Sequence, residues 1–143
     1  MDSIHILLVE DNEGDILLIK EAFEEARILN TISAVKDGEK AIRYLNKTGS
    51  YNDVKSPDLI LLDVNLPRKS GHEVLAFIKN NANLKQIPVV MLTTSSAEKD
   101  IIETCKNHAN CYITKPVEVD EFLQAITQIE NFWIQLVKLP SRP

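Results

Sequence analysis

Three short apolar segments of this chain each end in charged residues, and this pattern constrains the fold more than any other feature. The segments and the residues that follow them are 6–9 before Glu10-Asp11, 59–62 before Asp63, and 112–114 before Lys115-Pro116. Short apolar runs bounded by polar residues or proline are typical of strands in a parallel sheet, because helices cover both faces of such a sheet. The ligand crevice of that kind of sheet lies at the carboxyl ends of its strands. The pattern therefore predicts that three carboxylates and a lysine share one pocket.

Strand and helix patterns alternate five times along the chain, which predicts an α/β fold with a doubly wound, five-stranded parallel sheet flanked by helices. The strands are expected at residues 4–9, 31–35, 59–63, 88–92 and 111–114. Apolar residues at helical spacing predict the helices between them. These helices are expected to begin near Gly14 or Asp15, after Asp37-Gly38, near Gly71, near Ala97 and near Val117. Residues 49–57 are expected to form a polar loop.

The composition of the chain excludes several classes of protein. Its 143 residues suit one domain with a single core. A formal net charge of −5 argues against nucleic acid as the main partner, because binding phosphates needs a basic face. No apolar run approaches the roughly 20 residues of a membrane span, and the N-terminus lacks the basic region of a secretion signal. A single cytoplasmic domain without a DNA-binding or catalytic output module is therefore expected.

The three carboxylates of the predicted pocket need a positive partner. Two carboxylates about 4 Å apart repel by roughly 4 kcal/mol at an effective dielectric constant of 20. Three together either raise a pKa or bind a cation, and oxygen ligands favour Mg²⁺ or Mn²⁺ over softer metals. The alternative is that Glu10-Asp11 only caps the next helix, because acidic residues favour helix N-termini.

Several motifs follow one another along the chain: Glu10-Asp11, Asp63 with Asn65 and Pro67, Thr93 after an apolar strand, and Lys115-Pro116. Taken in this order, they resemble the receiver domain of two-component response regulators over residues 4–129. The resemblance implies a flavodoxin-like receiver fold and a signalling protein rather than a conventional enzyme. Such a protein accepts a phosphoryl group on Asp63 from a sensor histidine kinase, assists its own phosphorylation and dephosphorylation, and relays the signal through a conformational switch.

The resemblance also implies a metal site for Mg²⁺, with Mn²⁺ as a substitute. Asp11 and Asp63 would bind the metal directly, Asn65 would supply its backbone carbonyl, and Glu10 would act partly through water. Many members of the family carry aspartate where this chain has Glu10, so the longer side chain is expected to reposition that ligand without abolishing it.

Three further residues receive roles from the resemblance. Lys115 would balance charge on the transferred group, and a cis peptide bond before Pro116 would aim it into the pocket. Thr93, rather than the adjacent Thr94, would bind a phosphoryl oxygen, and Tyr112 would act with Thr93 as the switch. The alternatives are a solvated loop lysine at Lys115 and plain strand packing at Tyr112.

The C-terminal residues 130–143 are expected to extend the last helix beyond the core, taken as residues 4–129. Asn131-Phe132-Trp133 with Leu139-Pro140 resembles the response regulators of cyanobacterial and bacterial phytochromes, which implies a phytochrome-type kinase as partner. On a continued helix, five apolar residues would form one stripe. They are Ile129, Phe132, Trp133, Leu136 and Val137. Such a stripe predicts a homodimer, and the alternative is that it folds over the protein's own surface.

Two other functions fit parts of this pattern. A phosphatase-like hydrolase also uses an aspartate at the end of a parallel strand, but it places a second aspartate two residues later as general acid. This chain has Asn65 there, and an amide cannot donate and take protons. A receiver fold that only binds partners, without phosphorylation, is the other alternative. Every chemical position is filled by a suitable residue, which argues against it.

Overall fold

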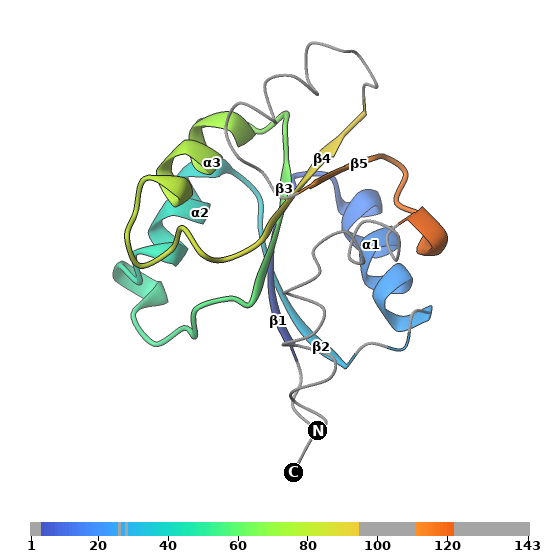
Figure 1. Ribbon diagram of the computed structural model, residues 1–143, viewed down its shortest axis with the longest axis horizontal. Helices are drawn as coiled ribbons and strands as arrows, with labels where there is room; N and C mark the ends of the chain where they lie inside the picture. The colour runs from blue at the N-terminus through green and yellow to red at the C-terminus, as the bar shows by residue number, and fades with distance from the viewer. Residues whose placement is uncertain (1–3, 26, 28, 95–110, 122–143) are drawn as a thin grey trace.

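The computed structural model describes residues 4–25, 27, 29–94 and 111–121, which form a five-stranded parallel sheet with helices on both faces (Figure 1). The strand order is β2-β1-β3-β4-β5. The strands are β1 (Ile4–Val9), β2 (Asn30–Val35), β3 (Leu59–Asp63), β4 (Val89–Thr93) and β5 (Cys111–Thr114). The order reverses between β1 and β3, and ligands of doubly wound sheets bind at such a switch point.

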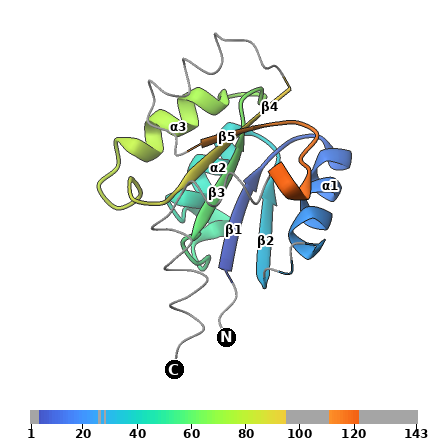
Figure 2. The same ribbon diagram turned by 45° about the vertical axis from the view of Figure 1, so that its right-hand side comes forward.

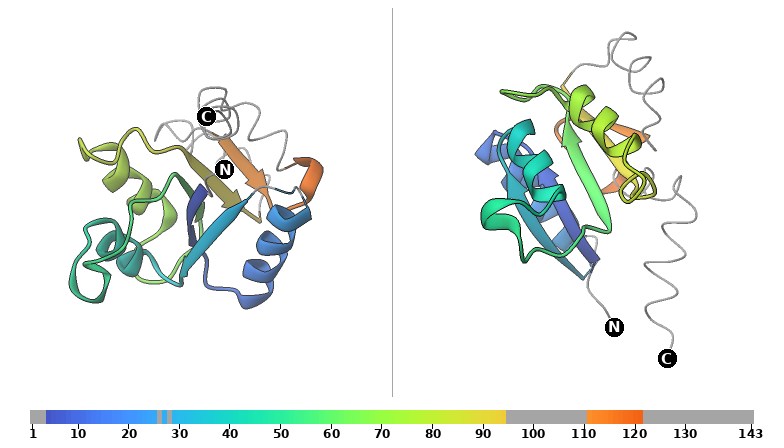
Figure 3. Two further views of the ribbon diagram at one scale, coloured as in Figure 1. Left: turned by 90° about the horizontal axis from the view of Figure 1, so that it is seen from below. Right: turned by 90° about the vertical axis from the view of Figure 1, so that its left-hand side faces the viewer.

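The sheet separates α1 from the other two described α-helices. Helix α1 (Glu13–Glu25) lies on one face, and α2 (Gly38–Leu45) and α3 (Gly71–Lys79) lie on the other, as Figure 2 and both views of Figure 3 show. A short 3-10 helix, η1 (Gly49–Tyr51), follows α2. No helix among the described residues combines the length and apolar character needed to cross a membrane.

Each face of the sheet buries its own apolar cluster. Strand β1 contributes to both, because successive side chains of a strand point to opposite faces. Ile6 and Leu8 pack in the cluster beneath α1, and Leu7 and Val9 pack in the cluster beneath α2 and α3. All five residues of β3 are buried, so this strand lies at the centre of the core and carries Asp63 into a protected position.

The predicted fold is confirmed, with small differences at element boundaries. Strands β1, β3 and β5 have the predicted bounds, and β2 begins one residue earlier at Asn30. Strand β4 begins at Val89 rather than Pro88 and extends to Thr93, since proline has no N–H for the ladder.

One local expectation about the segments between strands holds to within a residue, and the other was wrong. Helix α1 begins at Glu13, before the predicted Gly14 or Asp15, because the side chain of Asn12 accepts the backbone N–H of Asp15 and thereby caps the first turn. The expected polar loop at 49–57 contains η1, and the ring of Tyr51 in it packs on Tyr44 with the ring centroids 5.2 Å apart.

Some expectations lie outside the described residues. They are the helix predicted at 97–106 and the C-terminal extension with its apolar stripe, and both remain predictions. The helix expected near Val117 is described only at residues 119–121.

Candidate functional site

The carboxyl ends of four strands bring the predicted site residues to one edge of the sheet. Glu10 and Asp11 follow β1, Asp63 ends β3, Thr93 ends β4, and Lys115 follows β5. The parallel register aligns these ends, pairing Val9 with Leu62, Asp63 with Leu92, and Thr93 with Thr114.

Three carboxylates converge at this edge. Glu10, Asp11 and Asp63 each offer an oxygen atom within 4.8 Å of the others. Glu10 is fully buried and Asp63 is 3% exposed, whereas Asp11 is exposed. Carboxylate oxygens at this spacing suit a hard divalent cation, and the exposed side leaves room for the water ligands that Mg²⁺ retains.

Lys115 already pairs with two of these carboxylates, Glu10 and Asp63. Its Nζ donates to Glu10 Oε1 at 2.7 Å, to Asp15 Oδ2 at 3.1 Å and to Asp63 Oδ2 at 3.2 Å. The side chain is 7% exposed, and an ammonium group has three donors, so all of its hydrogens have partners. The alternative of a solvated loop lysine is therefore wrong.

The backbone at Lys115 has two notable features. The Lys115–Pro116 peptide bond is cis, as the resemblance implied. The backbone N–H of Lys115 donates to the carbonyl of Thr93 at 2.7 Å, which ties the end of β5 to the end of β4.

The site carries more negative than positive charge. Burial raises the pKa of the Glu10 carboxyl to about 7, and the nearby Asp63 charge adds to this effect against the hydrogen bond from Lys115. Burial by itself lowers the pKa of Lys115, but the hydrogen bond to Glu10, the charge of Asp63 and the hydrogen bond to Asp15 outweigh it, so the pKa lies above its usual value. One ammonium group faces several carboxylates, and a divalent cation fits this imbalance.

Asp63 is held by backbone contacts on both sides. The backbone N–H of Asn65 donates to Asp63 Oδ1 at 3.2 Å, and the N–H of Val64 donates to the carbonyl of Leu92 at 2.9 Å. A Cβ atom added to Gly71 would lie 2.2 Å from the Asp63 carbonyl oxygen, so the first residue of α3 must be glycine for the helix to approach this closely. Asp63 Oδ2 is left for Lys115.

The two adjacent threonines at the end of β4 differ in burial. Thr93 is 2% exposed and Thr94 is exposed, so Thr93 is the one turned toward the interior. Tyr112, in β5, is 40% exposed. The switch roles of Thr93 and Tyr112, and the role of the Asn65 carbonyl as a metal ligand, stay predictions.

Sequence reasoning missed Asp15 as a member of this site. The residue was expected only near the start of a helix, where an acidic side chain is already explained by the helix dipole. Its contact with Lys115 joins residues that are 100 positions apart, and the available signal, an acid one turn after Glu10-Asp11, has a local explanation as well.

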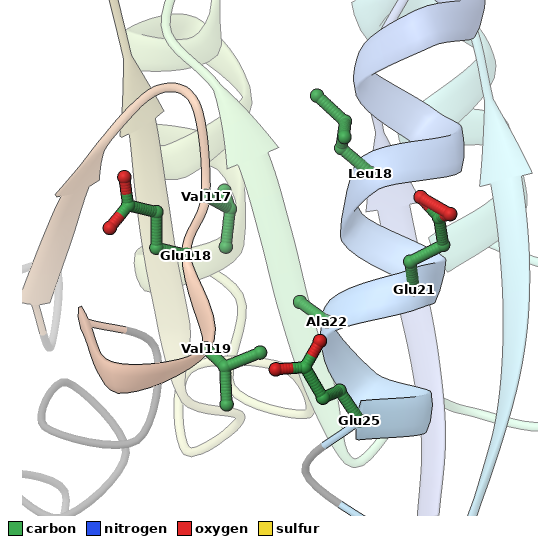
Figure 4. A pocket seen from close by; sticks show the side chains of 7 residues that line it. All are labelled: Leu18, Glu21, Ala22, Glu25, Val117, Glu118 and Val119. Carbon is green, nitrogen blue, oxygen red and sulfur yellow. The ribbon is translucent and has the colours of Figure 1, made fainter.

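A second hollow lies beside α1 and is separate from the acidic site (Figure 4). Residues of α1 form one wall, and the segment after the cis peptide bond forms the other. The lining residues are Leu18, Glu21, Ala22, Glu25, Val117, Glu118 and Val119. None of the predicted site residues lines this hollow, so it takes no part in the chemistry of the acidic cluster.

Comparison with known proteins agrees with this geometry. Residues 6–127 match the family model of the response regulator receiver domain. The chain is 44% identical over 136 residues to the response regulator Rcp1 of Synechocystis sp., covering 95% of this chain and 92% of that protein.

Solved structures give the same result. The phosphorylated cyanobacterial phytochrome response regulator RcpA is 47% identical, with a TM-score of 0.79 over 93% of this chain and 95% of that chain. The Mn²⁺-bound form of Rcp1 is 43% identical, with a TM-score of 0.77 over 94% of this chain and 96% of that chain. With its sheet order and acidic edge in addition, this chain belongs to the response regulator receiver domain family.

Proposed function

We propose that this protein accepts a phosphoryl group on Asp63 from a histidine kinase and passes the signal on by a change of conformation. The observation that carries the proposal is the setting of Asp63. This buried carboxylate ends the central strand, lies within 4.8 Å of two further carboxylates, and receives a hydrogen bond from Lys115 Nζ at 3.2 Å. Such a carboxylate can act as a nucleophile once nearby positive charge balances the attack.

Asp11 and Asp63 would hold the metal directly and Glu10 partly through water, with the backbone carbonyl of Asn65 as a further ligand. Mg²⁺ is the proposed ion and Mn²⁺ the substitute, and the Mn²⁺-bound form of the relative Rcp1 supports this choice. When bound, the ion supplies positive charge that offsets the carboxylates and the transferred group.

The chain's own residues then have distinct tasks in the transfer. An Asp63 oxygen forms the new bond to phosphorus while the bond from phosphorus to the donor nitrogen breaks, and the departing imidazole keeps the electron pair. Lys115, which contacts an Asp63 oxygen, would donate to the phosphoryl group, and Thr93, buried at the neighbouring strand end, would bind one of its oxygens through its hydroxyl. No step requires a general acid at Asn65, which distinguishes this reaction from that of a phosphatase-like hydrolase.

Incubation with acetyl phosphate and Mg²⁺, followed by intact mass measurement, tests the proposal. The protein is expected to gain the mass of one phosphoryl group, and to gain none when a chelator removes the metal. Absence of any gain with Mg²⁺ present, or an equal gain with the chelator, would contradict it.

Gly71→Ala is expected to displace the backbone of Asp63. The added methyl group would lie 2.2 Å from the Asp63 carbonyl oxygen, so either α3 or the end of β3 must move. Forcing a methyl group into a packed site costs about 1–3 kcal/mol, and phosphorylation should slow because the nucleophile is displaced. Urea unfolding and the rate of mass gain are the two measurements.

Gly49→Ala is the matched control for that substitution. Gly49 has a φ of +61° and nothing within 4 Å of an added Cβ, so alanine there costs about 1–2 kcal/mol through backbone strain alone. This variant should lose stability and keep the unmodified phosphorylation rate. If both variants slowed phosphorylation equally, lost stability rather than the displaced nucleophile would be the cause.

The proposed partner is a sensor histidine kinase of the phytochrome type, acting in the cytoplasm. The relative RcpA is a phytochrome response regulator. The proposal rests on the 47% identity to it and on the resemblance of Asn131-Phe132-Trp133 with Leu139-Pro140 to phytochrome response regulators. Nucleic acid is not a proposed partner, because the net charge is −5.

We propose in addition that the protein forms a homodimer through residues 129–137. The support is the apolar stripe of Ile129, Phe132, Trp133, Leu136 and Val137 in the sequence, since aromatic side chains in an exposed stripe are typical of an interface. Polar substitutions at both Phe132 and Trp133 should convert the dimer into a folded monomer in light scattering. If the unmodified chain is monomeric at tens of micromolar, whether phosphorylated or not, the proposed homodimer is contradicted.

A further inference from the structure

Lys115 has one acceptor that does not belong to the cluster of three carboxylates. Two of its acceptors, Glu10 and Asp63, are among the proposed metal ligands. The third, Asp15, comes from the first turn of α1 and lies outside that cluster. Its side chain is 27% exposed, and its Oδ2 is 3.1 Å from Lys115 Nζ.

A comparison of two helix starts, those of α3 and α1, shows that Asp15 is not committed to capping. At the start of α3, Ser70 and Glu73 form a reciprocal cap, in which the acid accepts the backbone N–H of the capping residue at 3.1 Å. At the start of α1, Asn12 accepts the N–H of Asp15 at 2.9 Å, but the N–H of Asn12 donates to Glu10 Oε2 at 3.2 Å instead. The carboxylate of Asp15 therefore does not accept the N–H of the capping residue, as the carboxylate of Glu73 does, and it accepts from Lys115 instead.

A divalent cation and Lys115 compete for the same two carboxylates. Lys115 Nζ lies 2.7 Å from Glu10 and 3.2 Å from Asp63. A cation bound by these groups would repel the ammonium group at short range, so metal binding is easier when the lysine shifts toward a different acceptor. Within the described residues, Asp15 is the other carboxylate that Lys115 already contacts.

We infer that Asp15 is a positioning residue that holds Lys115 when a divalent cation takes Glu10 and Asp63. Asp15 keeps the Lys115 ammonium group beside the pocket, where it can donate to the phosphoryl group. By accepting from that ammonium group, Asp15 also reduces the repulsion between Lys115 and the bound divalent cation. This inference rests on the proposed function, because it assumes that Mg²⁺ binds this site.

Calorimetric titration of Mg²⁺ into four proteins tests it: the unmodified chain, Asp15→Asn, Lys115→Ala, and the double variant. Asp15→Asn is expected to weaken Mg²⁺ binding about 3- to 10-fold, the size of a typical coupling between contacting residues. In the Lys115→Ala background the same change should alter the Mg²⁺ affinity less than about twofold, because the ammonium group that Asp15 holds is absent.

Glu13→Gln is the matched control for loss of charge. Glu13 also lies in the first turn of α1, but it pairs with Lys36 and is exposed, so its neutralisation should leave Mg²⁺ affinity within about twofold. Asp15→Glu should restore part of the affinity, since it keeps a carboxylate. Thermal unfolding of each variant checks that α1 remains folded.

The outcomes separate this inference from the proposed function. Equal weakening by Asp15→Asn with and without Lys115 would mean that Asp15 acts only through long-range charge, and would overturn the inference. The same holds if Asp15→Asn behaves like Glu13→Gln. In both cases the unmodified protein still binds Mg²⁺ and is phosphorylated, so the proposed function stands. An unmodified protein that binds no Mg²⁺ would overturn both.

Discussion

Asp63→Asn is expected to accept no phosphoryl group from acetyl phosphate or from a cognate histidine kinase. The amide is close in shape to the carboxylate and can still accept the N–H of Asn65, but it is not a nucleophile toward phosphorus. The loss should therefore be complete within the detection limit of intact mass measurement, while the fold is retained.

Asp58→Asn is the matched control, because Asp58 immediately precedes β3 and so lies at the end of the strand opposite to Asp63. Its Oδ2 accepts the backbone N–H of His5 at 2.8 Å, a contact that an amide oxygen can keep. This variant should gain one phosphoryl group at the unmodified rate. Stable phosphate on another residue of Asp63→Asn would contradict the assignment of Asp63 as the sole acceptor.

Asp11→Ala is expected to weaken Mg²⁺ binding strongly. Loss of a residue that only supports a metal ligand typically costs about 10- to 100-fold in affinity, and loss of a direct ligand should cost at least as much. Phosphorylation should slow in parallel, since the reaction depends on the ion. Calorimetric titration of Mg²⁺ is the measurement.

Lys115→Ala provides the contrast to that variant, because the lysine supplies a counter-charge and no ligand. It should bind Mg²⁺ at least as well as the unmodified protein and yet transfer or signal poorly. Equal Mg²⁺ affinity of Asp11→Ala and the unmodified protein would refute the role of Asp11 as a ligand.

The sequence predicted the sheet well, for a physical reason. A central parallel strand is buried on both faces, so its body is apolar. Strand β3 is the clearest case, because four buried apolar residues, 59–62, come before the buried Asp63. The end of such a strand is also where a polar residue stands out, which is why Asp63 could be located before the structure was known. Strand β4 begins one residue later than predicted, because Pro88 continues the apolar pattern but has no N–H for the ladder.

The contacts across the site were less predictable. That α3 approaches the backbone of Asp63 closely enough to require Gly71 depends on how the helix packs, and a glycine at a helix start has several explanations. The pairing of Asp15 with Lys115 joins α1 to the end of β5, and an acid in a first helical turn is expected whether or not such a partner exists. Local patterns therefore identified the strand ends, and tertiary packing decided which side chains meet there.

Chemical trapping of the phosphorylated residue tests the central claim most directly. Borohydride reduces an acyl phosphate to an alcohol, so an aspartyl phosphate becomes homoserine, which peptide mapping by mass spectrometry can locate. After reaction with acetyl phosphate and Mg²⁺, homoserine is expected at position 63 and at no other. Reduction at Asp11 or Asp15 instead, or phosphate that resists borohydride, would contradict the account.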